Sequence, residues 1–316
     1  MNLPRFWLGN HCCRSRRGEL RIPTPFAVKQ SQLTSAPTLL KLRCAERSTR
    51  AQGPGFTLIE LLVVIAILAV LAAFIFPALS AAKAKAHRID CLSREKQWAE
   101  AFLIYAEEHD GSIAREGYEP FGEVLLNNWS QVRGRPLPEG GRDSDDVWYN
   151  ALSPYLSQPP AADFASPANR AQFYDKRHLI HCPSARFPDH AFRPSFQFAL
   201  FSLAMNSQLI QYGQGPTINL TLIEQRDTSR IALFLDNLLE EEEKVHPAQE
   251  STFLGQPSAY ANRFSARHGR GGNLAFADGH AAWLPGNKVV ETNDKSPLRG
   301  GPILPPKEVI WDLYTY

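Results

Sequence analysis

The stretch GFTLIELLVV, residues 55–64, opens a long apolar run that contains a single acidic residue, Glu60. From Leu61 to Ala82 the chain has 22 consecutive uncharged residues. At about 1.5 Å rise per residue, a helix of this length spans roughly 33 Å, enough to cross the hydrocarbon core of a bilayer. The sequence therefore predicts one membrane-spanning helix, over about residues 58–82. A carboxylate costs roughly 2.5–3.5 kcal/mol in the middle of a membrane, so we expect Glu60 to have a function.

The residues GFTLIE at 55–60 closely resemble the cleavage and methylation signature of prepilins, the precursors of type IV pilins and of type II secretion pseudopilins. The resemblance implies that a prepilin peptidase cuts between Gly55 and Phe56 and methylates the new amino group of Phe56. Glycine suits the cut because the absence of a Cβ atom lets the backbone approach the peptidase closely. In assembled members of the family, the acid at the position of Glu60 lies opposite the N-terminal amine of a neighbouring subunit. That pairing neutralises two charges that lipid would penalise.

Two other kinds of N-terminal segment share some of these features. The first is an ordinary signal anchor in which the Glu60 side chain reaches the membrane interface. The second is a cleaved secretory signal. It fits less well, because the apolar run is longer than the about 7–15 residues of such signals and no Ala-x-Ala site clearly follows it.

Charge is distributed unevenly about residue 55. Residues 1–55 hold ten Lys or Arg and two acidic residues, whereas the remainder holds 24 basic and 30 acidic residues. Basic residues keep their flank of a membrane helix in the cytoplasm. We therefore expect residues 1–55 to be a basic cytoplasmic leader that processing removes, and residues 111–316 to lie in the periplasm or outside the cell. A nucleic-acid-binding arm at residues 14–17 is the alternative, but no aromatic residues interleave its charges, and we expect no nucleic-acid partner.

The helix is expected to continue beyond the membrane. Between Cys91 and Ala106 apolar residues recur at helical spacing, with Glu95, Lys96, Glu100 and Glu107 expected on the opposite, solvent-facing side. Asp110-Gly111 supplies a stop signal. One helix from Phe56 to His109, about 80 Å long and bent at Pro77, is therefore predicted. The resulting fold class is α+β, with residues 56–110 as a pilin-like helix packed on an antiparallel sheet.

Two strand signals lie in the soluble part. Residues 230–236 read as a buried strand, whereas residues 196–205 are apolar without a period that separates strand from helix. The stretch NLAFADGHAAWL at 273–284 alternates about a central Asp278-Gly279. This pattern predicts a hairpin with a two-residue type I′ turn, in which Leu274 pairs with Trp283 and Phe276 with Ala281.

A second resemblance is centred on the same hairpin, within residues 268–284. Nine residues separate His268 from Asp278, which resembles the His, nine residues, Asp-Gly signature near the end of prepilin-like proteins of planctomycete and verrucomicrobial type. Similar residues recur in the same order upstream: Cys91, Tyr105-Ala106, Asp110-Gly111, His181-Cys182-Pro183, Ala204-Met205-Asn206 and Ile231 to Asp236. The resemblance covers roughly residues 55–285.

The cysteines are divided by the processing site. Cys12, Cys13 and Cys44 lie in the leader, which leaves Cys91 and Cys182 in the mature chain. An even pair in an oxidising compartment predicts a disulfide, and two separately buried thiols are the alternative. Neither cysteine lies in a Cys-x-x-Cys or Cys-His ligand cluster, so no zinc is expected.

His268, Asp278 and His280 are residue types that can bind a divalent ion. Asp at the first position of a turn is nevertheless favoured for backbone reasons alone, and no nucleophile or phosphate-binding loop accompanies these residues. We therefore expect His268, Asp278 and Gly279 to be structural, with His268 hydrogen bonded to a neighbour such as Asp278. No metal, no cofactor and no catalytic residue is predicted.

These features predict a prepilin-like subunit that is not an enzyme and crosses the inner membrane once, with a cytoplasmic N-terminus. The expected partners are the prepilin peptidase, other pilin or pseudopilin subunits and inner-membrane lipid, with the cell surface as a location after assembly. One alternative is a surface binding module that uses the prepilin signal only for export and contacts a polysaccharide through Trp129 and Trp148. Another is an anchored metalloenzyme built on His268, Asp278 and His280.

Overall fold

The computed structural model describes residues 55–115, 127–138, 140–209, 218–247, 249, 251–252, 254–290, 309–311 and 313. The chain divides into two units, Met1–Thr57 and Leu58–Tyr316, and every helix and strand described below belongs to the second. Residues 1–54 of the expected leader, with Cys12, Cys13 and Cys44, lie outside the described residues.

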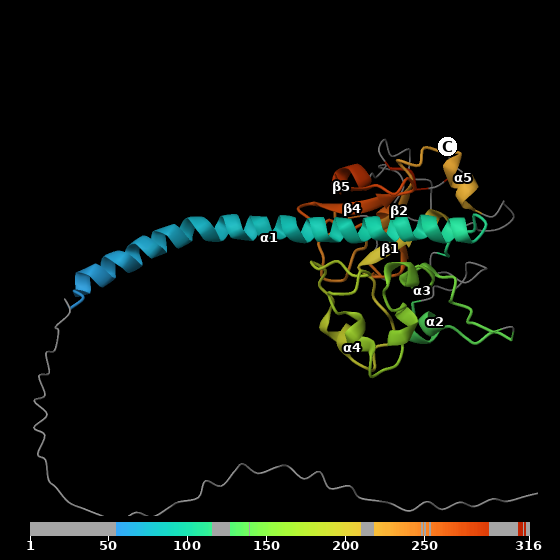
Figure 1. Cartoon of the computed structure of the whole chain (residues 1–316), viewed down its shortest axis with the longest axis horizontal. Helices are drawn as coiled ribbons and strands as arrows, with labels where there is room; N and C mark the ends of the chain where they lie inside the picture. Colours follow the sequence, from blue (N-terminus) through green and yellow to red (C-terminus); the bar gives the residue numbers. More distant parts are fainter. Residues whose placement is uncertain are drawn as a thin grey trace, which may run out of the picture. The chain divides into compact units, whose positions relative to one another are not determined.

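The first element is one helix, α1, which spans Leu58–Glu108 and contains 51 residues (Figure 1). It confirms the expected single helix and continues through Pro77 without ending. Its stop is the expected one: Asp110 and Gly111 have φ values of 54° and 82°, and the Gly111 N–H donates to the Ala106 carbonyl at 2.8 Å. A left-handed residue with this bond satisfies a carbonyl that the last helical turn would otherwise leave unpaired.

The domain contains one mixed sheet of five strands in the order β3-β1-β2-β4-β5. The strands are β1 (Leu203–Asn206), β2 (Ala232–Asp236), β3 (Ser258–Ala259), β4 (Gly271–Phe276) and β5 (Ala281–Pro285). β1 pairs antiparallel with β2, β2 with β4 and β4 with β5, whereas β3 runs parallel to β1. The α+β class is therefore confirmed, and the expectation of a purely antiparallel sheet is wrong at the β3 edge.

The remaining described helices are short. The α-helices are α2 (Trp129–Arg133), α3 (Trp148–Ala151), α4 (Arg170–Phe173), α5 (Leu220–Glu224) and α6 (Gly286–Val289). The 3-10 helices are Ser153–Leu156, Ala161–Phe164, Asp189–Phe192, Ser207–Leu209 and Ala261–Arg263.

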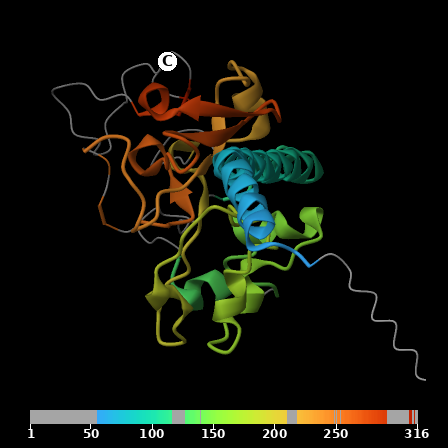
Figure 2. The same ribbon diagram turned by 90° about the vertical axis from the view of Figure 1, so that its left-hand side faces the viewer.

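The C-terminal half of α1 packs against the domain core. It lies between the β4–β5 side of the sheet and the segment that carries α2 to α4 (Figures 1 and 2). Trp98 is its largest buried side chain, with its ring centroid 5.0 Å from that of Trp148 and 6.3 Å from that of Phe234. The Trp98 indole N–H donates to the Leu179 carbonyl at 3.1 Å, so the ring is fixed at both its apolar and its polar end.

Trp129 and Trp148 belong to this core as well. Their exposed fractions are 1% and 0%. The expectation that they are exposed aromatic residues for binding a polysaccharide is therefore wrong, because both rings fill space in the domain interior.

The loop between β4 and β5 has three residues rather than two. The Gly279 N–H donates to the Phe276 carbonyl at 2.9 Å, and the Phe276 N–H donates to the His280 carbonyl at 2.8 Å. Within the loop, residues 277–279, only Gly279 has a positive φ, 84°. This pattern is a turn followed by a left-handed glycine, and not a type I′ turn, which needs positive φ at both central residues.

The extra loop residue changes the strand register. Leu274 pairs with Ala282, and Asn273 pairs with Trp283. The expected pairing of Leu274 with Trp283 is wrong by one residue, because loop length sets the register of a hairpin.

Candidate functional site

The start of α1 carries the residues expected for processing and assembly. Gly55 and Phe56 precede the helix, so the bond between them lies outside it, and Phe56 is 71% exposed. Glu60 is exposed in the first helical turn, where a carboxylate interacts favourably with the helix dipole.

The first half of α1 presents a continuous apolar surface. Between Phe56 and Leu79 most of the large apolar side chains are about half exposed or more, and no described residue of unit Leu58–Tyr316 covers the most apolar window of the helix. An apolar surface of this size needs lipid or other protein to cover it. The helix thus fits a single-pass membrane anchor.

A cluster of titratable and metal-binding residue types is buried in the domain. It consists of Cys91 on α1, Cys182 before β1, Asp236 at the end of β2 and His268 before β4, whose ligand-type atoms all lie within 4.8 Å of one another. The Cys91 Sγ lies 3.4 Å from Asp236 Oδ1, and the Cys182 Sγ lies 3.3 Å from His268 Nε2. His268 Nε2 is also 3.6 Å from Asp236 Oδ2. The structure therefore brings together three residues singled out in the sequence and adds Asp236.

Cys91 and Cys182 are close together but unbonded. Both are buried free thiols in the structure. They lie in one cluster, which allows a disulfide with a modest shift, and the disulfide and the alternative of two unpaired thiols both stay predictions.

The pKa values of the two cluster thiols shift in opposite directions. Burial raises the pKa of the Cys91 thiol well above its ordinary value. Burial acts on Cys182 in the same direction, but hydrogen bonds from Cys91 and His268 outweigh it and lower the Cys182 pKa. Burial lowers the pKa of His268, and the bond to Cys182 with the charge of Asp236 reverses this and raises it. Burial also raises the pKa of Asp236, to about 6.

Glu95 is a further buried acid beside the cluster. It is 0% exposed, and neither carboxylate oxygen has a hydrogen-bond partner among the described residues. It lines the same small internal space as Cys91, Cys182 and Asp236. The expectation that Glu95 faces solvent is wrong: residues 91 and 95 are one helical turn apart, so they share the buried face of α1.

Arg267 supplies the positive charge near these acids. Its Nη2 atom pairs with Glu242 Oε2 at 3.0 Å, and the two side chains are 4% and 10% exposed. Ser265 Oγ donates to the same Glu242 oxygen at 2.7 Å. Arg267 and Ser265 thus satisfy the Glu242 carboxylate inside the protein.

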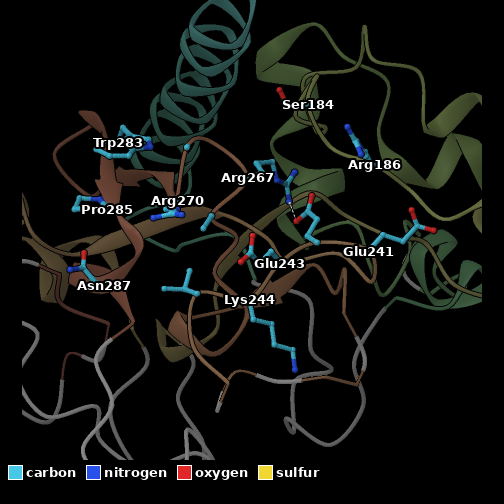
Figure 3. Close-up of a pocket in the computed structure, with 14 residues that line it drawn as sticks. Ser184, Arg186, Glu241, Glu243, Lys244, Arg267, Arg270, Trp283, Pro285 and Asn287 are labelled. Carbon is cyan, nitrogen blue, oxygen red and sulfur yellow. Dashed lines mark hydrogen bonds and ion pairs between the residues drawn. The ribbon is translucent and has the colours of Figure 1, made fainter. Parts of the chain in front are cut away.

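Arg267 also lines an open cleft of about 840 Å³ (Figure 3). Charged side chains of both signs surround this cleft, among them Arg186, Glu241, Glu243, Lys244 and Arg270. Burial lowers the pKa of Arg267, but the charges of Glu242, Asp236 and the two cysteines raise it above its ordinary value. Arg267 is therefore both part of the cleft wall and a counter-charge to the buried cluster.

Asp278 and His280 form a separate pair in the hairpin. Asp278 Oδ1 accepts from the His280 backbone N–H at 3.0 Å and lies 2.5 Å from His280 Nδ1. The expected hydrogen bond between His268 and Asp278 is wrong, since His268 Nε2 lies beside Cys182 Sγ and Asp236 Oδ2 and Asp278 pairs with His280. The metalloenzyme alternative loses its basis, because the described ligand group around His268 contains neither Asp278 nor His280.

Comparison with known proteins identifies one feature. Residues 54–76 match the family described as the prokaryotic N-terminal methylation motif. A search of curated proteins and a search of solved structures found no match. The matched residues include Gly55, Phe56 and Glu60 and continue into the exposed apolar half of α1. The chain therefore carries a prepilin-type methylation motif, which supports a prepilin-like protein of the pilin or pseudopilin type.

Proposed function

We propose that the chain is a prepilin-like structural subunit that prepilin peptidase cuts between Gly55 and Phe56 and methylates on Phe56. The observation that carries this proposal is the match over residues 54–76, which leads directly into α1. A methylation motif followed by an exposed apolar half-helix is the arrangement that a membrane-inserted, assembling subunit needs.

In this proposal the first half of α1 has two successive environments. Before assembly it crosses the inner membrane, with the basic leader in the cytoplasm and the sheet domain in the periplasm. After assembly it packs among equivalent helices in a type IV pilus-like filament or a type II secretion pseudopilus-like structure. There the Glu60 carboxylate meets the N-terminal amine of Phe56 in a neighbouring subunit, which compensates two charges in an apolar interior.

The test is to shear cells that express the full chain and to analyse the released material by mass spectrometry. We expect filament-associated protein whose first residue is N-methylated Phe56. A mature protein that starts at Met1, or at any residue other than Phe56, would overturn the processing step. Correctly processed protein that never leaves the membrane fraction would overturn assembly into a surface filament.

A pair of glycine variants sharpens the processing test. Gly55→Val places a branched side chain at the scissile bond and is expected to leave the precursor uncut. Gly53→Val, two residues earlier, is the matched control and should be processed normally. Equal processing of the two variants would show that the cut is not at Gly55.

A further inference from the structure

We propose that Cys91, Cys182, Asp236 and His268 bind one zinc ion that fastens α1 to the sheet domain. This proposal is independent of filament assembly, because it concerns only the buried half of α1 and the residues packed against it. It differs from the expectation that His268 holds no ion, and it uses partners other than the hairpin residues Asp278 and His280.

The spacing of the four ligand atoms suits a tetrahedral ion. Metal–ligand bonds of about 2.0–2.3 Å give a tetrahedron with edges of about 3.3–3.8 Å. Cys182 Sγ lies 3.3 Å from His268 Nε2. One Asp236 oxygen, Oδ1, lies 3.4 Å from Cys91 Sγ, and the other, Oδ2, lies 3.6 Å from His268 Nε2. One ligand atom from each residue lies within 4.8 Å of the others, so small side-chain shifts would place the four groups around one ion.

The orientation of His268 favours a shared central ion over a catalytic relay. In a Cys-His-Asp relay the cysteine and the aspartate contact opposite nitrogens of the imidazole. Here the same atom, Nε2, faces both the Cys182 sulfur and the Asp236 carboxylate. One ring nitrogen cannot direct a single proton at both groups, whereas its lone pair, two sulfurs and a carboxylate oxygen can all point at a metal.

The donor set selects zinc and a structural role. Two thiolates, one imidazole and one carboxylate form a mixed S, N and O set, which in tetrahedral geometry is typical of Zn²⁺. Four protein ligands leave no position for a substrate or a reactive water, as in structural sites. All four residues are buried, with exposed fractions between 0% and 6%.

The charges of the cluster residues also favour a bound cation. Two thiolates and the Asp236 carboxylate amount to three negative charges when the ligands are deprotonated, and a divalent ion neutralises two of them. Asp236 Oδ2 accepts the Asn273 backbone N–H at 2.8 Å, and the Trp283 indole N–H donates to the His268 carbonyl at 2.8 Å. Such outer contacts orient the ligands of metal sites.

A disulfide is the competing chemistry for the same thiols. A disulfide would use both sulfur atoms. Asp236 Oδ1 would then lose the Cys91 thiol that contacts it, and His268 Nε2 would lose the Cys182 thiolate, both inside a buried site. Unpaired polar groups at such depth are costly. A zinc ion instead satisfies all four groups at once.

The test measures metal in the full chain, purified from membranes in detergent with a tag that lacks histidine and without chelators. Cys12, Cys13 and Cys44 are first changed to Ser, so that only the cluster cysteines remain. Elemental analysis should give about one zinc per chain. Replacement by Co²⁺ should give thiolate-to-cobalt charge-transfer bands and the visible bands of a tetrahedral site. Metal-free protein, with either two free thiols or a mass two hydrogens lower from a disulfide, would overturn the proposal.

Two histidine variants locate the ion. His268→Gln should reduce zinc to the level of the buffer, whereas His280→Gln, in the neighbouring hairpin, should keep about one zinc per chain. Full zinc content in His268→Gln would overturn the assigned ligand set. If His268→Gln fails to fold, the cobalt spectrum of the wild-type cluster still decides, because the absence of thiolate-to-cobalt bands would itself overturn the site.

Discussion

The Nε2 atom of His268 lies 3.3 Å from the Sγ atom of Cys182, although the two residues are 86 positions apart in the chain. This contact joins the segment before β1 to the segment before β4. Cys91 adds α1 to the same point, and Asp236 adds the end of β2. Four parts of the fold that are distant in sequence thus meet in one buried site.

Glu60→Ala should leave cleavage and membrane insertion intact, because the helix only becomes more apolar, and should strongly reduce the yield of sheared filament. Glu107→Ala, an exposed acid near the other end of α1, is the matched control and should assemble normally. The two yields are compared by immunoblot of sheared and cell-bound fractions. A normal yield from Glu60→Ala would remove the proposed role of this acid in assembly.

Gly279→Val should destabilise the domain through backbone strain. Gly279 has a φ of 84°, whereas an added Cβ would have its nearest contact, Leu103 Cδ1, at an ordinary 3.5 Å. A left-handed conformation costs an L-residue roughly 1–2 kcal/mol, so the urea midpoint should fall. Gly279→Asn should cost less, since Asn tolerates this region. Equal midpoints for the two variants would contradict a strain mechanism.

Arg94→Lys should weaken the attachment of α1 to the loop at residues 176–181. The Arg94 Nη1 atom donates to the carbonyls of Lys176, His178 and His181 at 2.8, 2.8 and 2.7 Å. A lysine ammonium lacks the planar fork of Arg, and a buried acceptor left unpaired costs about 1–3 kcal/mol. Thermal unfolding in detergent gives the measurement.

The control for this substitution is Lys96→Ala, which removes an exposed pair with Glu100 at 3.5 Å. Exposed pairs of this kind contribute about 0–1 kcal/mol, so the melting temperature should barely change. A loss in Lys96→Ala as large as that in Arg94→Lys would show that the buried carbonyl contacts carry no special weight.

Glu95→Gln should make stability less dependent on pH. Burial, followed by the charges of Asp236 and Cys182, raises the pKa of Glu95 well above its ordinary value of 4.5. The folded chain therefore keeps a proton that the unfolded chain releases, so stability falls as pH rises above about 4.5, with a slope of up to about 1.4 kcal/mol per pH unit.

Gln keeps the shape of Glu95 and does not titrate. The difference in unfolding free energy between Glu95→Gln and the wild type should therefore grow in favour of the variant from about pH 5 to pH 7. Denaturant titrations at several pH values measure it. Parallel stability profiles for the two proteins would show that Glu95 does not hold its proton in the folded state.

The sequence predicts the parts of the fold that local chemistry specifies. The apolar run, the helical stripe and Asp110-Gly111 define α1 nearly to its ends, and the apolar stretch at 230–236 identifies β2. The hairpin position is also predicted, but its register is not. The dipeptide Asp278-Gly279 allows both a two-residue loop and a turn with a left-handed glycine, and strand packing decides between them.

The four cluster residues, at 91, 182, 236 and 268, all belong to segments of the second resemblance, but they share no short motif, so the sequence does not show that they meet. One feature of the sequence indicates a buried polar site: Asp236 ends an otherwise apolar strand, and a buried carboxylate needs a polar partner. Glu95 is a second such feature, since it lies one helical turn after Cys91 and so shares the apolar face of α1. The burial of Trp129 and Trp148 is not predicted, because an aromatic side chain alone does not show whether it fills a core or faces a ligand.

Because α1 joins its exposed half to its buried half without a loop, tension on a filament of the proposed kind would pass along a single helix into the domain core. Arg94, Trp98 and Phe102 would bear that load in shear. Pro77 is the one residue of α1 whose backbone nitrogen cannot donate to the preceding turn. Under tension, α1 is therefore expected to lose helical structure first at Pro77. The helix would lengthen there before the domain unfolds.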